Sequence, residues 1–174
     1  STEVGRVLLK EAAERVIRCS MELGGNAPFL VLSDANVDEA VAGALLAKMR
    51  NGGAACTAAN RFYVAKEVAE EFTTKLAKVM GDLKMAPGIT AGAQLGASVS
   101  VKERNKIAEL VDASVTAGGQ VKTGGKSPVG VGAFYPATVL TVKNDNPILN
   151  QEIFGPVAPI VITTSDEEAI SLAN

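Results

Sequence analysis

Short apolar runs alternate with longer segments of helix-spaced apolar residues along most of this chain. The apolar runs predict strands at residues 16–23, 28–32, 61–65, 120–123, 134–142 and 157–163. The helical spacing predicts helices at residues 2–15, 37–50, 67–84 and 99–117, with a last helix from residue 166 onward. Because strands and helices alternate, the pattern predicts an α/β fold with a mostly parallel sheet covered by helices.

The segments between these elements do not divide the chain. Residues 85–98 and 124–132 are rich in Gly and lack periodicity, so both are predicted to be irregular. No internal repeat or Pro/Ser-rich linker is present. The chain opens directly on a helix start without Met, and it stops within a helix that has no C-terminal cap. We therefore expect it to be a piece of a longer protein.

Composition excludes several partner classes. The 174 residues carry a net charge of −2 with both signs interspersed, which argues against a nucleic-acid or anionic-membrane partner. No apolar run approaches the ~20 residues that a membrane span needs, and no signal peptide is visible. The two cysteines, Cys19 and Cys56, could form one disulfide, but such a count usually means free thiols in a reducing compartment. The expected location is therefore the cytoplasm.

The chain contains no histidine, which limits the chemistry that it can perform. Ser-His and Cys-His dyads and His-ligated metal sites are excluded, and no metal site is expected. Cys56 lies in the Gly/Ala-rich segment 51–59, where small neighbours would let a substrate approach the sulfur. Free cysteines are most often small buried hydrophobes, and Cys19, in the predicted strand 16–23, is interpreted in that way. For Cys56 a nucleophilic thiolate is the alternative.

Three charged residues could complete such a site, although each also has an ordinary structural explanation. Glu22 precedes Gly24 and Gly25, where backbone can approach a ligand, and a carboxylate in a partly dry pocket can act as a general base. Arg50 suits the C-terminus of a helix, but six residues before Cys56 it could also bind a substrate carboxylate. Glu152 begins a Glu-Ile-Phe-Gly-Pro segment that alone would indicate only a turn.

Taken together, these segments resemble the aldehyde dehydrogenase superfamily. Ser-Thr-Glu-Val-Gly, Glu-Leu-Gly-Gly-Asn-Ala-Pro, the Cys in its Gly/Ala loop and Glu-Ile-Phe-Gly-Pro occur in the order of that superfamily, over the whole chain. Within it, the Met-Arg-Asn and Cys-Thr-Ala-Ala-Asn-Arg segments look most like succinate-semialdehyde dehydrogenases. The resemblance implies that residues 1–15 are the tail end of a cofactor-binding domain and that residues 16–174 are a catalytic domain truncated at its C-terminus.

The resemblance also implies a role for each site residue. Cys56 would be the nucleophile and Glu22 the general base, and Arg50 would bind the distal carboxylate of the substrate. The positions expected at the cofactor, NAD or NADP, are Ser1 at the pyrophosphate, Leu23 and Phe154 near the nicotinamide, and Glu152 at the nicotinamide ribose. The implied reaction converts an aldehyde to a carboxylic acid through a Cys56 thiohemiacetal and thioester. The full-length protein would be a homo-oligomer.

Two departures from the family pattern are visible. Ala54 occupies the usual position of a Gln, and Ala58 replaces a second cysteine that some members use as a redox switch. The family's oxyanion-hole Asn and most of its dinucleotide site would lie outside this chain, so the fragment alone is expected to be nearly inactive. Two other hypotheses stay open: a non-catalytic folding or assembly unit, and a cofactor-independent thiol enzyme such as a thioesterase.

Overall fold

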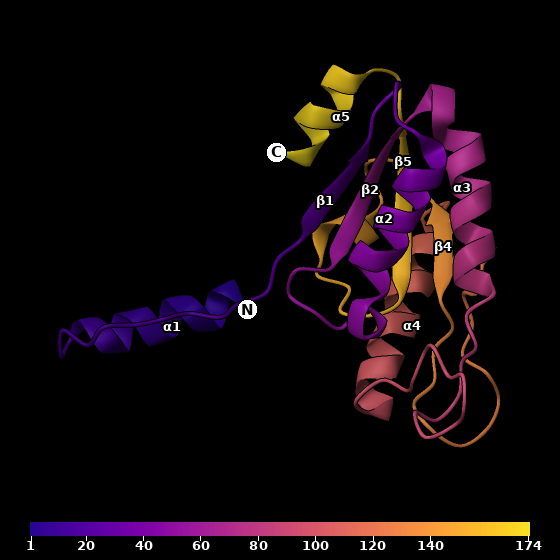
Figure 1. Cartoon of the computed structure of the whole chain (residues 1–174). Helices are drawn as coiled ribbons and strands as arrows, with labels where there is room; N and C mark the ends of the chain where they lie inside the picture. Colours follow the sequence, from indigo (N-terminus) through magenta and orange to yellow (C-terminus); the bar gives the residue numbers. More distant parts are fainter.

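The computed structural model describes all 174 residues and shows five strands, five α-helices and two short 3₁₀ helices (Figure 1). The strands are β1 (Ala27–Val31), β2 (Ala59–Ala65), β3 (Gln120–Thr123), β4 (Thr138–Thr141) and β5 (Val157–Thr163). The α-helices are α1 (Thr2–Ala13), α2 (Val37–Met49), α3 (Lys66–Gly81), α4 (Val101–Thr116) and α5 (Asp166–Ala173). The 3₁₀ helices are η1 (Arg50–Gly53) and η2 (Pro147–Asn150).

The five strands form one sheet in the order β1-β2-β5-β4-β3. The β1–β2, β2–β5 and β5–β4 pairs are parallel, and only β3 runs antiparallel to its neighbour β4. In the register, Phe62 of β2 lies between Phe29 of β1 and Ile160 of β5. The predicted mostly parallel sheet covered by helices is therefore confirmed.

Successive residues of the central strands point to opposite faces of the sheet and build two separate cores. Phe62 and Val64 of β2 pack with α2 and α3, whereas Tyr63 between them faces the core that includes α4 and α5. Because both faces are covered, the central strands are mostly apolar, which explains their appearance as short apolar runs in the sequence. None of the helices is long and apolar enough to cross a membrane.

Helix α1 lies apart from this body, and residues 14–26 run back along it without forming a strand (Figure 1). The predicted strand 16–23 is therefore wrong. Its apolar residues have no neighbouring strand to pair with, and Val16 and Ile17 are exposed. Cys19 is consequently half-buried in irregular backbone rather than enclosed in a strand, and both Cys19 and Cys56 are free thiols. At the other end of this segment, Leu23 packs so closely on Gly5 of α1 that a Cβ atom there would clash with it.

Other predicted boundaries move by a few residues for local reasons. The strand expected at 134–142 shrinks to β4, because Pro136 cannot donate to a ladder. Helix α4 begins after Ser100, whose hydroxyl accepts a hydrogen bond from the N–H of Glu103 and caps the helix. Helix α3 ends at Gly81, three residues earlier than predicted.

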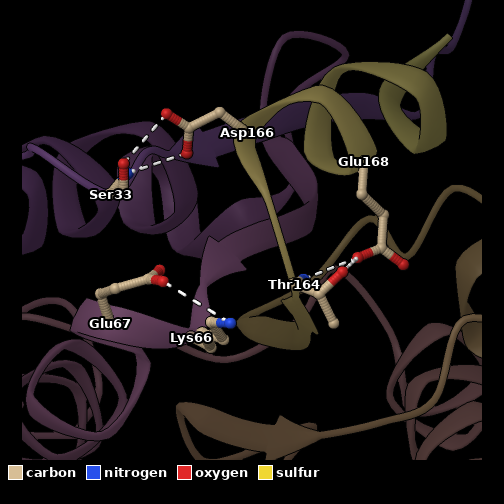
Figure 2. Close-up of polar contacts among 6 residues, drawn as sticks. All are labelled: Ser33, Lys66, Glu67, Thr164, Asp166 and Glu168. Carbon is tan, nitrogen blue, oxygen red and sulfur yellow. Dashed lines mark hydrogen bonds and ion pairs between the residues drawn. The ribbon is translucent and has the colours of Figure 1, made fainter.

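A polar contact links the start of the last helix to the turn that follows β1 (Figure 2). Asp166, the first residue of α5, accepts hydrogen bonds from the N–H and the hydroxyl of Ser33, at 2.9 and 3.1 Å. At the same end of β5, the carboxylate of Glu168 accepts from the N–H and hydroxyl of Thr164, which lowers the pKa of that carboxyl. These contacts set where α5 leaves the sheet.

Candidate active site

Cys56 is exposed and lies in the irregular segment between η1 and β2. Helix α2 ends at Met49, and the backbone then makes an abrupt change of direction. Asn51, Gly52 and Gly53 all have positive φ angles of 52°, 61° and 78°. Glycine adopts such angles without strain, so Gly52 and Gly53 let the chain turn towards Cys56.

Two close backbone contacts bring distant segments to this loop. A Cβ atom on Gly53 would overlap the carbonyl of Gly155, and one on Gly25 would lie 3.5 Å from the carbonyl oxygen of Cys56. The loop of Cys56 therefore lies against both the Gly24–Gly25 turn and the Gly155–Pro156 segment. The three motifs that the sequence analysis singled out converge, and Gly53 permits the closest of these approaches.

Glu152 is the charged residue most firmly built into this arrangement. Its carboxylate Oε1 accepts a hydrogen bond from the N–H of Gly25 at 3.3 Å, and the carboxylate covers Gly24 so closely that a Cβ there would overlap Oε2. The side chain is half-buried. The carboxylate of Glu152 is thus held in position beside the loop of Cys56. It is a suitable acceptor for hydrogen bonds from the hydroxyl groups of a ligand.

Glu22, Leu23 and Ser1 lie on α1 and its return segment. Glu22 is exposed two residues before Gly24, and its carboxylate accepts no hydrogen bond. Leu23 is half-buried against Gly5. Ser1 is the N-cap of α1, and its hydroxyl accepts from the N–H of Val4 at 3.4 Å. Ser1 and Glu22 are both exposed, but no hydrogen bond ties either of them to Cys56.

Arg50 is exposed at the junction of α2 and η1, and its guanidinium forms no hydrogen bond or ion pair. It therefore has all five of its N–H donors available for a ligand. Its backbone N–H still bonds to the carbonyl of Leu46, so the side chain starts from the ordered end of a helix.

Phe154 lines a hollow of about 620 Å³ next to this region. It has a positive φ of 40°, unusual for an aromatic residue, and its side chain is 47% exposed. The hollow is also bordered by Met49, Asn51, Ala54 and Gly155. A larger hollow of about 1010 Å³ lies between α3 and strands β3 to β5, but none of the predicted site residues lines it. Of the predicted site residues, Phe154 alone lines the smaller hollow, and Cys56 and Glu152 line neither.

Sequence reasoning missed two residues of this region, Lys48 and Asn60. Both are buried, and the ammonium of Lys48 donates a 3.1 Å hydrogen bond to Oδ1 of Asn60. Nδ2 of Asn60 donates at 3.2 Å to the carbonyl of Gly25. The spacing of 12 residues across a turn gives no signal in the sequence, because only the fold brings the end of α2 beside the start of β2.

Comparison with known proteins identifies the family of this chain. The family model described as "Aldehyde dehydrogenase family" matches residues 1–174. A succinate-semialdehyde dehydrogenase of Paenarthrobacter nicotinovorans is 52% identical over the whole chain, which covers 39% of that protein. The chain belongs to the aldehyde dehydrogenase family.

Solved structures have the same fold. The crystal structure of succinate-semialdehyde dehydrogenase from Burkholderia pseudomallei superimposes with a TM-score of 0.96 and 40% identity, and it matches all of this chain and 36% of its own. A 3,6-anhydro-L-galactose dehydrogenase solved in complex with NAP has a TM-score of 0.94 at 34% identity, with 100% of this chain and 38% of that one covered. The chain therefore spans well under half the length of the proteins that it matches.

Proposed function

We propose that the whole protein is an NAD(P)-dependent aldehyde dehydrogenase in which Cys56 is the nucleophile. The observation that carries this proposal is the convergence at Cys56. Its exposed thiol lies on a loop that contacts the Gly24–Gly25 turn, and that turn is bonded to Glu152. In this proposal residues 1–15 belong to the cofactor-binding domain, residues 16–174 form part of the catalytic domain, and the isolated chain has little activity.

The thiolate of Cys56 adds to the carbonyl carbon of the aldehyde and forms a thiohemiacetal. NAD(P)⁺, when bound, would supply the acceptor for the hydride of this carbon. The carbon is then held as a thioester on Cys56. Glu22 takes a proton from a water molecule, the resulting hydroxide attacks the thioester carbon, and the carboxylic acid departs as the Cys56 thiolate is regenerated. The exposed, unbonded carboxylate of Glu22 has an acceptor free for that water.

The residues assigned to the cofactor fit its chemistry. A ribose presents two vicinal hydroxyls, and the held carboxylate of Glu152 can accept from both. Gly24 and Gly25 carry no side chains that would block the approach of a ligand to this carboxylate. We assign Ser1 to the pyrophosphate, where a hydroxyl and the N-terminus of α1 favour negative charge. Leu23 and Phe154 would border the nicotinamide ring.

The proposed substrate is an aldehyde with a distal carboxylate, such as succinate semialdehyde. Arg50 supports this choice, because its guanidinium is exposed, unpaired and able to bind a carboxylate with two parallel hydrogen bonds. The 52% identity to a succinate-semialdehyde dehydrogenase supports the same substrate class. We propose further that the protein works in the cytoplasm as a homo-oligomer, without a nucleic-acid or membrane partner.

A spectrophotometric assay of the whole protein tests the proposal. Wild-type protein should reduce NAD⁺ or NADP⁺ when succinate semialdehyde is added. Arg50→Ala should lose most of its kcat/KM for succinate semialdehyde while keeping its activity towards an uncharged aldehyde of similar length. Arg104→Ala, which removes an arginine from α4, is the matched control and should behave as wild type. Equal loss for both aldehydes would refute the carboxylate-binding role of Arg50, and absence of any reduction would refute the dehydrogenase.

A second candidate is that the chain by itself is an assembly unit. The observation in its favour is the set of apolar side chains on α1 that remain half or more exposed: Val4, Val7, Leu8 and Leu9. Such a surface favours association with another chain or domain. Sedimentation of the isolated chain should show self-association, and a compact monomer over a wide concentration range would count against this role.

A further inference from the structure

Lys48 is the only buried Asp, Glu, Lys or Arg in the chain, with no exposed surface. It lies on the last turn of α2, eight positions before Cys56, and it is enclosed by the core of the sheet. Burial lowers the pKa of this ammonium from 10.5 to about 7, while the negative charge of Glu152 opposes the shift.

A continuous set of hydrogen bonds runs from Lys48 to Glu152. Lys48 donates to Asn60 (3.1 Å), Asn60 donates to the carbonyl of Gly25 (3.2 Å), and Gly25 donates to the carboxylate of Glu152 (3.3 Å). The orientation of the Asn60 amide is fixed from both sides, because the ammonium of Lys48 can only donate and the carbonyl of Gly25 can only accept. Oδ1 of Asn60 therefore faces α2, and Nδ2 faces Gly25.

Stability does not account for a lysine at this position. A buried ammonium loses its hydration, and the fold provides it with a single hydrogen-bond acceptor and no ion pair within 4 Å. An apolar side chain of similar length would avoid this cost, and replacing buried charge by hydrophobic residues is often neutral or stabilising. A residue that lowers stability next to reactive groups is typical of a functional trade-off.

We propose that Lys48 is a positioning residue: through Asn60 it holds the Gly24–Gly25 turn, and this turn fixes the Glu152 carboxylate for the ribose of the cofactor. The inference rests on the proposed function, in which Glu152 binds that ribose. Without the ammonium, Oδ1 of Asn60 loses its partner, and the side chain of Asn60 is held at one end only, by its bond to the Gly25 carbonyl. The Gly24–Gly25 turn is then held less firmly, and Glu152 loses its fixed position.

The test measures affinity and stability side by side in the whole protein. Lys48→Met should raise the dissociation constant for NADPH or NADH about tenfold, the loss expected for one charge-assisted hydrogen bond. Binding is measured by the fluorescence of the reduced cofactor, without turnover. The thermal unfolding midpoint should stay the same or rise. Lys66→Met is the matched control, because Lys66 is exposed and its ammonium forms an ion pair only with Glu67, at 3.9 Å (Figure 2).

Two further variants separate positioning from general damage. Asn60→Asp gives Lys48 a paired charge in the core but removes the donor to Gly25, so it should weaken cofactor binding like Lys48→Met while the protein stays folded. In a Glu152→Ala background, Lys48→Met should add nothing to the loss of affinity, because the group that Lys48 positions is gone.

The outcomes are distinguishable. Lys48→Met that binds the cofactor like wild type, or that loses stability and affinity together, would overturn the inference and leave the dehydrogenase proposal intact. Additive effects of Lys48→Met and Glu152→Ala would overturn it as well. Wild-type protein that binds neither reduced cofactor would overturn both.

Discussion

The carboxylate of Glu152 lies directly over the Cα atom of Gly24, although 128 positions separate the two residues in sequence. Any side chain on residue 24 would occupy the space of the carboxylate oxygens. The adjacent N–H of Gly25 then holds the same carboxylate through a hydrogen bond. Gly24 is thus explained by a single neighbour, and the position of Glu152 is sensitive to one methyl group on residue 24.

Gly24→Ala should displace Glu152 without disturbing the core. Because residue 24 is exposed, the new methyl group can push the carboxylate outward at little cost to stability. We expect the dissociation constant for the reduced cofactor to rise about tenfold, an effect of about 1.4 kcal/mol. Gly88→Ala is the control, since a Cβ there meets no atom within 4 Å. Unchanged affinity in Gly24→Ala would contradict the role of Glu152.

Gly53→Ala should lower the stability of the fold, whereas Gly24→Ala should lower the affinity for the cofactor. Gly53 is buried, has a φ of 78°, and would drive a Cβ into the carbonyl of Gly155. Left-handed backbone strain and overpacking together should lower the free energy of unfolding by about 3 kcal/mol.

Gly43→Ala provides the opposite control for Gly53→Ala. Gly43 lies within α2, and a Cβ there would make only an ordinary 3.7 Å contact with Phe29. This variant should gain about 0.5–1 kcal/mol from the removal of a helical glycine. Urea unfolding of both variants measures the difference in their free energies of unfolding. Equal changes in the two variants would contradict a tight contact between residue 53 and Gly155.

The pH dependence of stability should reveal the burial of Lys48. In the unfolded chain its pKa is the ordinary 10.5, whereas the folded value is about 7. Between these values the unfolded state holds a proton that the folded state has lost, so wild-type stability rises with pH relative to Lys48→Met. The variant should be the more stable protein below pH 7, and its advantage should shrink towards pH 10. A gap in unfolding midpoint that does not change with pH would place the ammonium in a solvated site.

The sequence predicted well those elements that are determined by nearby residues, such as helix caps and continuous apolar runs. Strands β2 and β5 are apolar on both faces because helices cover both, so their runs are visible without any knowledge of partners. Helix α2 was predicted to within one residue, since Asn36 caps its start and the glycines after Asn51 end it. The cysteine loop and the Glu-Ile-Phe-Gly-Pro segment were also recognisable from their residue types.

The features that the sequence alone could not predict depend on contacts between residues that are distant in the chain. Residues 16–23 have the composition of a strand, but no neighbouring strand pairs with them, so they stay irregular. Lys48 gave no signal, because an Ala-rich helix shows no clear apolar face against which a buried lysine would stand out. Its partnership with Asn60 and Gly25 exists only once α2 and β2 are packed together.

The most direct test of the account is peptide mass spectrometry on the whole protein with Glu22 changed to Gln. With succinate semialdehyde and NAD⁺ or NADP⁺ present, this variant should form the thioester and hydrolyse it slowly. Acid quenching and digestion should then show one added acyl group on the peptide that contains Cys56, and none on the peptide that contains Cys19. Cofactor reduction with no acyl group on Cys56, or reduction that survives Cys56→Ala, would contradict the central claim that Cys56 is the nucleophile.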